Sequence, residues 1–545
     1  MSALSTGISG LLAFQRALEV HSRNIANVNT EGHVREDVQL ASRGGGNLLS
    51  GGLSGGVDVA RVRREVNEFL LSQARTANAS ASRAEVYAEK IANINGVIAS
   101  TGTGFDESLQ ALREAFEGVA TEPTSRQARE AWFAQLESSV ARFIDIDNRL
   151  KAYDQEIDGR LALEVGEINR LSSQIADVNQ QIVAATALRG SAPADLMDAR
   201  DRALDELAEI TSIQVSRVEN NGIEVTTARG VSLVQGGDAT RLAYVADDFD
   251  RSRGRVVITS LNGAEASVDL VGGSVGGLND ARRQVLDPTR DEIGRIIFAL
   301  SEVLNSQNQL GERTDGVAGQ ALLGVQAPRV LSRESNVGDA EMTVVATRLG
   351  ELTGGEYLLE WQADTWVARD ARTGAALTVS GEGTEANPLR VGGLDLVFDA
   401  TQVADRDQFL VRPTRDAIDG LRVLATSGAD LAAAGVDTGP GNNLNGLALA
   451  EAFARGELDN GTLSFADAAV ALKSRVGSAA QSAEGNSELQ RLTANDVDTQ
   501  RASAFGVSLD EEAAQLIRFQ QSYQAAAQII RVSNEIFDTL ISVAR

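Results

Sequence analysis

Both ends of the chain carry apolar residues at seven-residue spacing, and this feature restricts the fold more than any other. The first series, flanked by Ile8 and Phe14, consists of Leu4, Leu11, Leu18 and Ile25. The second series consists of Leu509, Leu516, Tyr523, Ile530 and Phe537. Phe519 and Leu540 follow Leu516 and Phe537 by three residues. Such a stripe is typical of an amphipathic helix that pairs with another helix. Distant ends can pair only if the chain folds back, so we expect a hairpin-like molecule with its ends together and β domains at the far tip.

Between the ends, helical and strand patterns alternate. Helical spacing dominates from about residue 65 to 183, most regularly over 157–182, and recurs over 195–210 and 278–310. Period-two alternation runs from 213 to about 270, where Asn221-Gly222 predicts a hairpin, and again over 343–411. After Pro413 the chain is expected to be helical to its end. The predicted fold class is multidomain α+β, with terminal helices paired as a coiled coil, a long helical bundle and β-rich outer domains.

We predict three structural units. A terminal helical assembly domain combines 1–60 with 490–545, and a helical domain combines 61–330 with 415–489 and carries a small β insert near 212–272. A β-rich outer domain covers 331–414. The stripe at 157–182 is assigned to the core of the bundle. The terminal stripes are assigned to contacts between molecules, because with Phe14, Phe519 and Tyr523 they offer more apolar surface than one partner helix covers.

Composition argues against several classes of function. The formal net charge is −26, which opposes binding to nucleic acid and to anionic membranes. No run of eighteen apolar residues exists, so no membrane insertion is expected, and the first apolar run is broken by Gln15, Arg16 and Glu19, unlike a cleaved signal peptide. With no cysteine and only His21 and His33, we expect no metal and no cofactor.

Two polar features receive structural interpretations. His21 lies within the first predicted helix and is expected to be a solvated or interfacial polar residue. Asp510, Glu511 and Glu512 open the last helix, where carboxylates interact favourably with the positive end of the helix dipole. We interpret this triplet as helix-start chemistry, and not as a general acid–base site.

Several motifs resemble one known family. The block FQRALEVHSRNIANVNTEGHVR (14–35) is similar to the N-terminal signature of flagellar rod, hook and hook-associated proteins, and GVSLDEEAAQLIRFQQSYQAAAQII (506–530) resembles the ending of hook-associated protein 1. Interior segments resemble that family in the same order: 55–70, 195–210, 305–319, 407–414, 439–449 and 472–484. The chain departs from the family's usual residues at Glu31, His33 and Asn308.

The resemblance implies a structural subunit and not an enzyme. It implies export through the flagellar type III apparatus without a cleaved signal peptide, and an extracellular position in a ring between the hook and the filament. The implied partners are copies of the chain, the hook protein, the second junction protein and an export chaperone at the C-terminal helical region. Asn27 and Asn29 of the N-terminal signature join the heptad residues as predicted assembly residues.

Two alternatives remain open at the level of sequence. One is a hook protein or another rod-type axial subunit, which the C-terminal motif and the long helical region at 65–210 oppose. The other is a secreted adhesin or cell-wall hydrolase with an axial-type N-terminus. A glycan hydrolase requires two carboxylates that converge in a cleft. The sequence contains many acidic residues but no recognisable catalytic motif.

Overall fold

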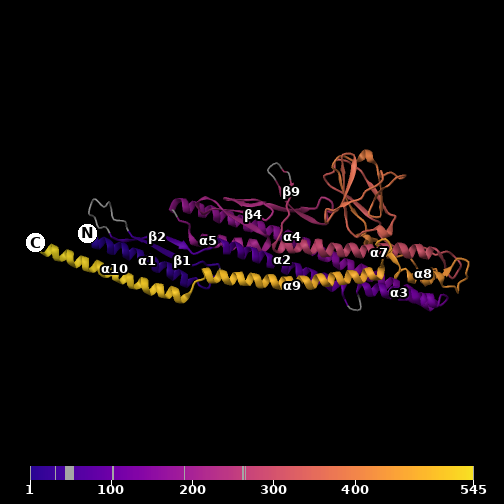
Figure 1. The fold of residues 1–545 in the computed structure, drawn as a ribbon, viewed down its shortest axis with the longest axis horizontal. Helices are drawn as coiled ribbons and strands as arrows, with labels where there is room; N and C mark the ends of the chain where they lie inside the picture. The colour runs from indigo at the N-terminus through magenta and orange to yellow at the C-terminus, as the bar shows by residue number, and fades with distance from the viewer. Residues whose placement is uncertain are drawn as a thin grey trace.

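The computed structural model describes residues 2–30, 32–42, 55–100, 104–189, 191–259, 263 and 265–543. The molecule is a long helical shaft with both termini at one end (Figure 1). Its helices are α1 (Ser2–Ala26), α2 (Glu68–Ile98), α3 (Phe105–Thr121), α4 (Arg126–Arg189), α5 (Ala194–Ile210), α6 (Gly273–Ala281), α7 (Asp287–Gln309), α8 (Leu444–Glu451), α9 (Phe465–Phe505) and α10 (Leu509–Val543). The chain therefore folds back on itself, as the paired terminal stripes predict.

The shaft is a bundle around one apolar core. Its longest helix, α4, has 64 residues, which at 1.5 Å per residue is about 95 Å. The predicted stripe of 157–182 lies in the core, where Leu161, Ile168, Ile175 and Ile182 are buried. At the end of the shaft remote from the termini, Phe116 packs against Trp132 and Phe453 at ring distances of 5.5 and 5.8 Å. The helix α9 passes without a break through residue 490, the predicted start of the terminal unit.

A small β block lies along α4 (Figure 1). Its first sheet has the order β3 (Ile213–Arg217), β4 (Ile223–Thr227), β5 (Ser232–Gln235) and β6 (Asp238–Ala239), and its second has β7 (Leu242–Ala246), β8 (Gly254–Thr259) and β9 (Glu265–Ser267). The predicted hairpin at Asn221-Gly222 is confirmed, with Asn220 and Asn221 in the left-handed region. Asn179 of α4 holds this block: its Nδ2 donates to Ile223 O at 3.1 Å and its Oδ1 accepts from Ile223 N at 2.9 Å.

The outer domain contains two further sheets. One has the order β12 (Arg329–Ser332), β19 (Gln408–Arg412), β14 (Tyr357–Gln362), β15 (Thr365–Asp370) and β16 (Ala376–Leu377), and the other has β13 (Met342–Ala346), β18 (Leu394–Phe398) and β17 (Leu389–Val391). Half-buried Trp366 packs against their shared core, 5.1 Å from Phe398 and 5.8 Å from Phe409 between ring centres.

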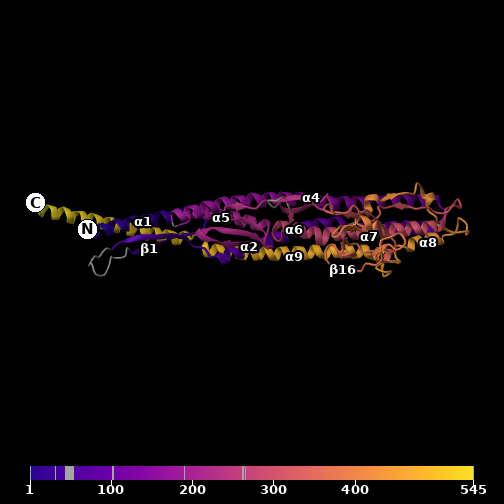
Figure 2. The ribbon, with the colours of Figure 1, turned by 90° about the horizontal axis from the view of Figure 1, so that it is seen from above.

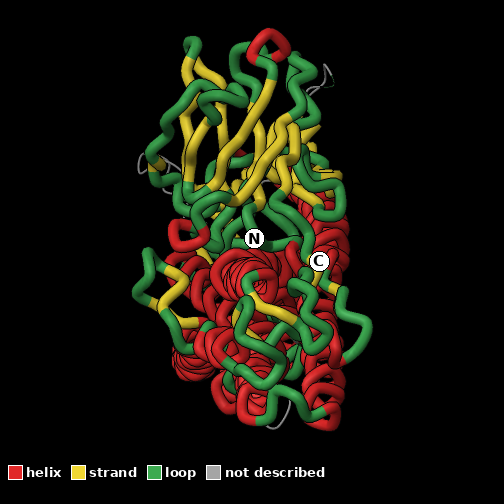
Figure 3. Tube along the Cα trace, turned by 90° about the vertical axis from the view of Figure 1, so that its right-hand side faces the viewer, coloured by secondary structure: helices red, strands yellow, loops and turns green. Residues whose placement is uncertain are grey.

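The structure corrects three expectations. The β domains flank the shaft and do not form its tip, which belongs to α3 and α8 (Figures 1 and 3). The segment after Pro413 forms no α-helix before α8 and has only short 3-10 turns. Two strands within 414–443 pair instead with the loop after α7: β20 (Arg422–Val423) with β11 (Leu323–Gly324) and β21 (Ala434–Gly435) with β10 (Gly311–Glu312). The helix expected over 278–310 begins at Gly273 and contains a π-helical turn over Arg282–Leu286.

A buried ionic network joins the outer domain to the shaft. Arg415 binds Asp291 of α7 through two bonds of 2.6 and 3.0 Å and also contacts Glu356 of the outer domain at 2.9 Å. Arg412 continues the network to Glu356 and to Asp250. Burial raises the pKa of Asp291 to about 7 against the lowering effect of Arg415. The ionised carboxylate is therefore held by its arginine in a site that disfavours charge.

We expect Arg415→Leu to lower the free energy of unfolding by about 3–5 kcal/mol, because it leaves buried carboxylates without their cation. The matched control Arg369→Leu, at an exposed position of β15, should change it by less than about 0.5 kcal/mol. Urea denaturation of the full chain measures both values.

An Asp291 pKa of about 7 lies above the unfolded value of about 4, so the contribution of Asp291 to stability is present at low pH and is lost as the pH rises through 7. Without Arg415 the loss of stability with rising pH is larger. The decrease in the free energy of unfolding caused by Arg415→Leu should therefore be larger at pH 8 than at pH 5. Equal deficits at both pH values would contradict this account.

Candidate assembly interface

The two ends of the chain form an antiparallel helix pair, seen at the left of Figures 1 and 2. Gly7 of α1 faces Ile530 of α10, and Phe14 lies 6.3 Å from Phe519 between ring centres. A Cβ atom at Gly7 would lie 2.8 Å from Ile530 Cγ1. The glycine therefore permits a close approach of the helices that a larger residue would prevent.

The apolar residues predicted for the interface are only partly covered by the contact between α1 and α10. The half-buried members of the set are Leu11, Phe14, Leu18, Ile25, Leu516, Phe519, Tyr523 and Ile530. The exposed apolar members are Leu4, Ile8, Leu509, Phe537 and Leu540. The buried face of α1 is instead made of smaller or polar side chains, among them Ala13, Ala17, Val20, His21 and Asn24. Much of the heptad stripe therefore remains available to another molecule.

The two predicted asparagines lie at the end of α1. Asn27 Nδ2 donates to Arg23 O at 3.1 Å, and its Oδ1 accepts from Thr30 Oγ1 at 3.2 Å, so Asn27 closes the turn after the helix. Asn29 is exposed in that turn.

A two-stranded ribbon forms the third layer of this unit. It consists of β1 (Glu36–Ser42) and β2 (Val57–Arg64), paired antiparallel. Val38 and Val62 pack with Ala17, Val20 and Phe519 in a small apolar cluster. The ribbon thus covers the helix pair on one side.

The carboxylate of Glu512 is the polar centre of the unit and is fully buried. Its Oε2 lies 2.6 Å from His21 Nδ1 and 3.0 Å from Asn24 Nδ2, and its Oε1 accepts from Arg35 Nε at 2.8 Å. Asn24 Oδ1 also accepts from the backbone N of Glu36, the first residue of β1, at 3.1 Å. One carboxylate therefore joins α10 to α1 and, through Arg35 and Asn24, to the ribbon.

A ladder of carboxylates on α5 connects this unit to the shaft. Asp198 and Asp201 contact Arg64 of β2 at 2.6 and 2.9 Å. Asp205 contacts Arg75 of α2 at 2.7 Å and Arg501 of α9 at 2.9 Å. Burial raises the pKa of Asp198, against the lowering effects of Arg64 and His33. The spacing of three and four residues places all three carboxylates on one face of α5.

Within the described residues, no group of three or more His, Asp or Glu side chains could hold a metal ion. In the same part of the chain, no helix has the length and apolarity needed to cross a membrane.

Comparison with known proteins identifies the family. The Escherichia coli strain K12 protein named flagellar hook-associated protein 1 is 30% identical over 99% of this chain and 100% of its own length. The chain belongs to the hook-associated protein 1 family. It is accordingly a structural component of the bacterial flagellum, outside the cell. A Bacillus subtilis protein of the same name is 24% identical over 99% of this chain and 97% of its own length.

Family models agree with this assignment, and a solved structure shares the fold. The flagellar hook-associated protein FlgK helical domain matches residues 59–323, and the flagella basal body rod protein model matches 4–33. The C-terminal model of the flagellar basal body rod FlgEFG proteins matches 500–543. The flagellar hook junction protein FlgK from Burkholderia pseudomallei shares the fold, with a TM-score of 0.74 and 20% identity over 79% of this chain and all of that one.

Sequence reasoning about this hook-associated protein missed the central role of Glu512. The residue lies at the start of α10 as expected, but its side chain binds α1 and Arg35 instead of projecting into solvent. The sequence does contain one signal of this role. Glu512 lies on the same helix face as Leu516 and Phe519, which indicates that its side chain points toward the helix contact. His21, Asn24 and Arg35 belong to the N-terminal signature itself, which here supplies the partners of that carboxylate.

We expect Glu512→Gln to loosen the terminal unit, because the amide cannot accept from Arg35, His21 and Asn24 as a carboxylate does. In hooks isolated from cells, the variant should dissociate at a lower urea concentration than the unaltered protein. The control is Glu488→Gln, which removes an exposed carboxylate of α9 that pairs with Arg491. Equal dissociation of the two variants would show that burial of Glu512 has no special effect.

Proposed function

We propose that this chain forms the ring that joins hook to filament and that it assembles with copies of itself through α1 and α10. The names of its relatives support a hook-associated role, and the solved protein that shares its fold is described as a hook junction protein. The observation that carries the proposal is the unpaired apolar end of α10.

This end extends past α1. Because the helices are antiparallel and Gly7 already faces Ile530, the residues of α10 after about 535 have no part of α1 opposite them (Figure 1). Phe537 and Leu540 are 61% and 62% exposed, and Ile536 and Ile541 are also exposed. A contiguous apolar surface of this kind indicates a protein interface. Leu4 and Ile8 extend it on α1.

We propose the hook protein and the second junction protein as the neighbours along the axis. Before export, the same apolar surface of α10 requires cover, and an export chaperone at the C-terminal helical region would supply it. Export would proceed without a cleaved signal peptide, since α1 is itself part of the folded interface.

We propose no catalytic role. The carboxylates of buried Asp291 and half-buried Glu356 could suggest a hydrolase, but both form ion pairs with Arg415. Their geometry serves to connect domains.

Deletion of the gene tests the junction role. We expect cells that build hooks without filaments and lose monomeric flagellin to the medium, because nothing would join the filament to the hook. Electron microscopy of the cells and immunoblots of the medium measure the two outcomes. Normal filaments on the deletion strain would refute the proposal.

Substitution of the α10 end tests the interface. We expect Phe537→Asp with Leu540→Asp to reproduce the deletion phenotype although the chain is exported, because charge at these positions opposes burial against a neighbour. The matched control is Leu163→Asp with Leu188→Asp, two α4 residues that are 77% and 86% exposed, and it should leave filaments attached. Normal swimming of the α10 variant would place the interface elsewhere.

A further inference from the structure

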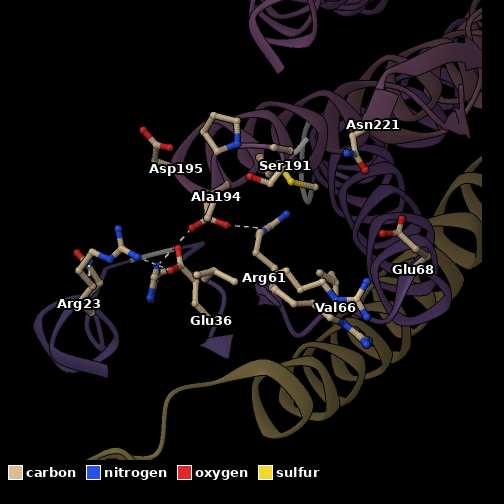
Figure 4. Close-up of a pocket in the computed structure, with 18 of the residues that line it drawn as sticks. Arg23, Glu36, Arg61, Val66, Glu68, Ser191, Ala194, Asp195 and Asn221 are labelled. Atoms are coloured by element: carbon tan, nitrogen blue, oxygen red, sulfur yellow. Dashed lines mark hydrogen bonds and ion pairs between the residues drawn. The ribbon is translucent and has the colours of Figure 1, made fainter. Parts of the chain in front are cut away.

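A cleft of about 1010 Å³ separates the terminal unit from the start of α5 (Figure 4). We call it the arginine cleft, because its lining includes Arg16, Arg23, Arg61, Arg63 and Arg217. The lining also contains half-buried His33, buried Asp198 and exposed Ser191. None of the apolar heptad residues of α1 and α10 lies in this lining, so the cleft is separate from the apolar surface of those helices.

Two of these arginines lack a carboxylate partner. Arg23 pairs with Glu36, Arg217 with Glu68, and Arg16 with Glu19. For Arg61 and Arg63, no carboxylate oxygen lies within 4 Å in the part of the chain that the structure describes.

The ribbon holds both side chains toward the same side. Arg61 and Arg63 alternate along β2 with Val62, which packs toward α1, and side chains two residues apart project from one face of a strand. Arg61 Nε donates to Gln39 Oε1 at 2.7 Å, and both arginines are exposed. Two guanidinium groups without a carboxylate partner among the described residues are therefore displayed together at the cleft.

The charge of the whole chain indicates what such a site receives. Copies with a net charge of −26 repel one another at long range. A neighbouring copy can approach closely only where groups of opposite sign meet, and a guanidinium binds a carboxylate through paired hydrogen bonds. Unpaired arginines in a cleft of this acidic chain thus suit the carboxylates of a second copy.

The same unit displays carboxylates at a different place. Asp510 and Glu511 are exposed at the bend between α9 and α10, which we call the acidic bend, and Asp510 has no ion-pair partner among the described residues. In Figure 1 the bend lies below α1 and β1, whereas β2 and α5 lie above them. Two different complementary patches on opposite sides of a unit produce a head-to-tail contact, which can close into a ring.

We propose that the arginine cleft of one subunit receives the acidic bend of the next copy in the ring. This inference rests on the proposed function, since it requires copies side by side. The contact would be electrostatic and distinct from the apolar packing of α1 and α10, and it would set which copy lies beside which face.

Photo-crosslinking in flagellated cells tests the contact. The crosslinking residue p-benzoylphenylalanine replaces Ser191 in the full chain, an exposed residue of the cleft lining. We expect a crosslinked dimer of this chain in which the partner peptide is the tryptic fragment 502–518, which contains the acidic bend. A second crosslinker position, Phe537, reports apolar assembly independently.

The outcomes separate the two proposals. Crosslinks from position 537 without any from position 191, or crosslinks from 191 only to another protein or another segment, overturn the cleft contact alone. The absence of crosslinks to any protein at both positions contradicts the proposed assembly itself.

Charge reversal provides the second measurement. Arg61→Glu with Arg63→Glu should abolish the dimer formed from position 191, and adding Asp510→Arg to that chain should restore it. The matched control is Arg475→Glu, at an exposed position of α9, which should leave the dimer unchanged. Persistence of the dimer in the variant that carries only Arg61→Glu and Arg63→Glu overturns the proposal.

Discussion

The rest of the terminal unit depends on burial of the Glu512 carboxylate. A buried charge is stable only when it is paired and hydrogen-bonded, and this one requires His21, Asn24 and Arg35 together. Those partners come from the opposite end of the chain, so the requirement fixes which turn of α1 lies beside which turn of α10. Apolar stripes alone permit a helix pair to slide by a turn or a heptad. The carboxylate removes that freedom, and the extension of α10 past α1 follows from the fixed register.

Asparagine performs a related task along the molecule. Asn24, Asn169 and Asn179 each project from a helix and pair with both backbone groups of one strand residue: Glu36, Leu242 and Ile223. An amide side chain offers one donor group and one acceptor, as a strand does. Each helix therefore satisfies the backbone groups at the first residue of a neighbouring strand. Ribbon and β block are held to long helices by hydrogen bonds with defined positions, in addition to apolar contact.

The sequence predicted the helices, the hairpin at Asn221-Gly222 and the return of the chain, because these follow from periodicity and local turn chemistry. It did not predict the irregular path of 414–443, since that path is determined by contacts with residues 311–326 that lie far away in sequence. The same reason applies to Glu512 and Arg415, whose partners become visible only in three dimensions. For the predicted interface, spacing identified apolar residues on α1 and α10, but the small residues Gly7 and Gly10 lie against Ile530 and Ala526 of α10.

The paired strands β12 and β19 have a consequence for how this family can vary. Arg329 and Arg412 are direct partners, so the chain enters and leaves the outer domain at neighbouring points on the shaft. A domain attached in this way can be shortened, enlarged or exchanged without moving the helices on either side of it. The helical shaft can thus stay constant while the outer domain attached to it varies. The outer surface of this flagellar component can therefore diversify while the axial assembly stays the same.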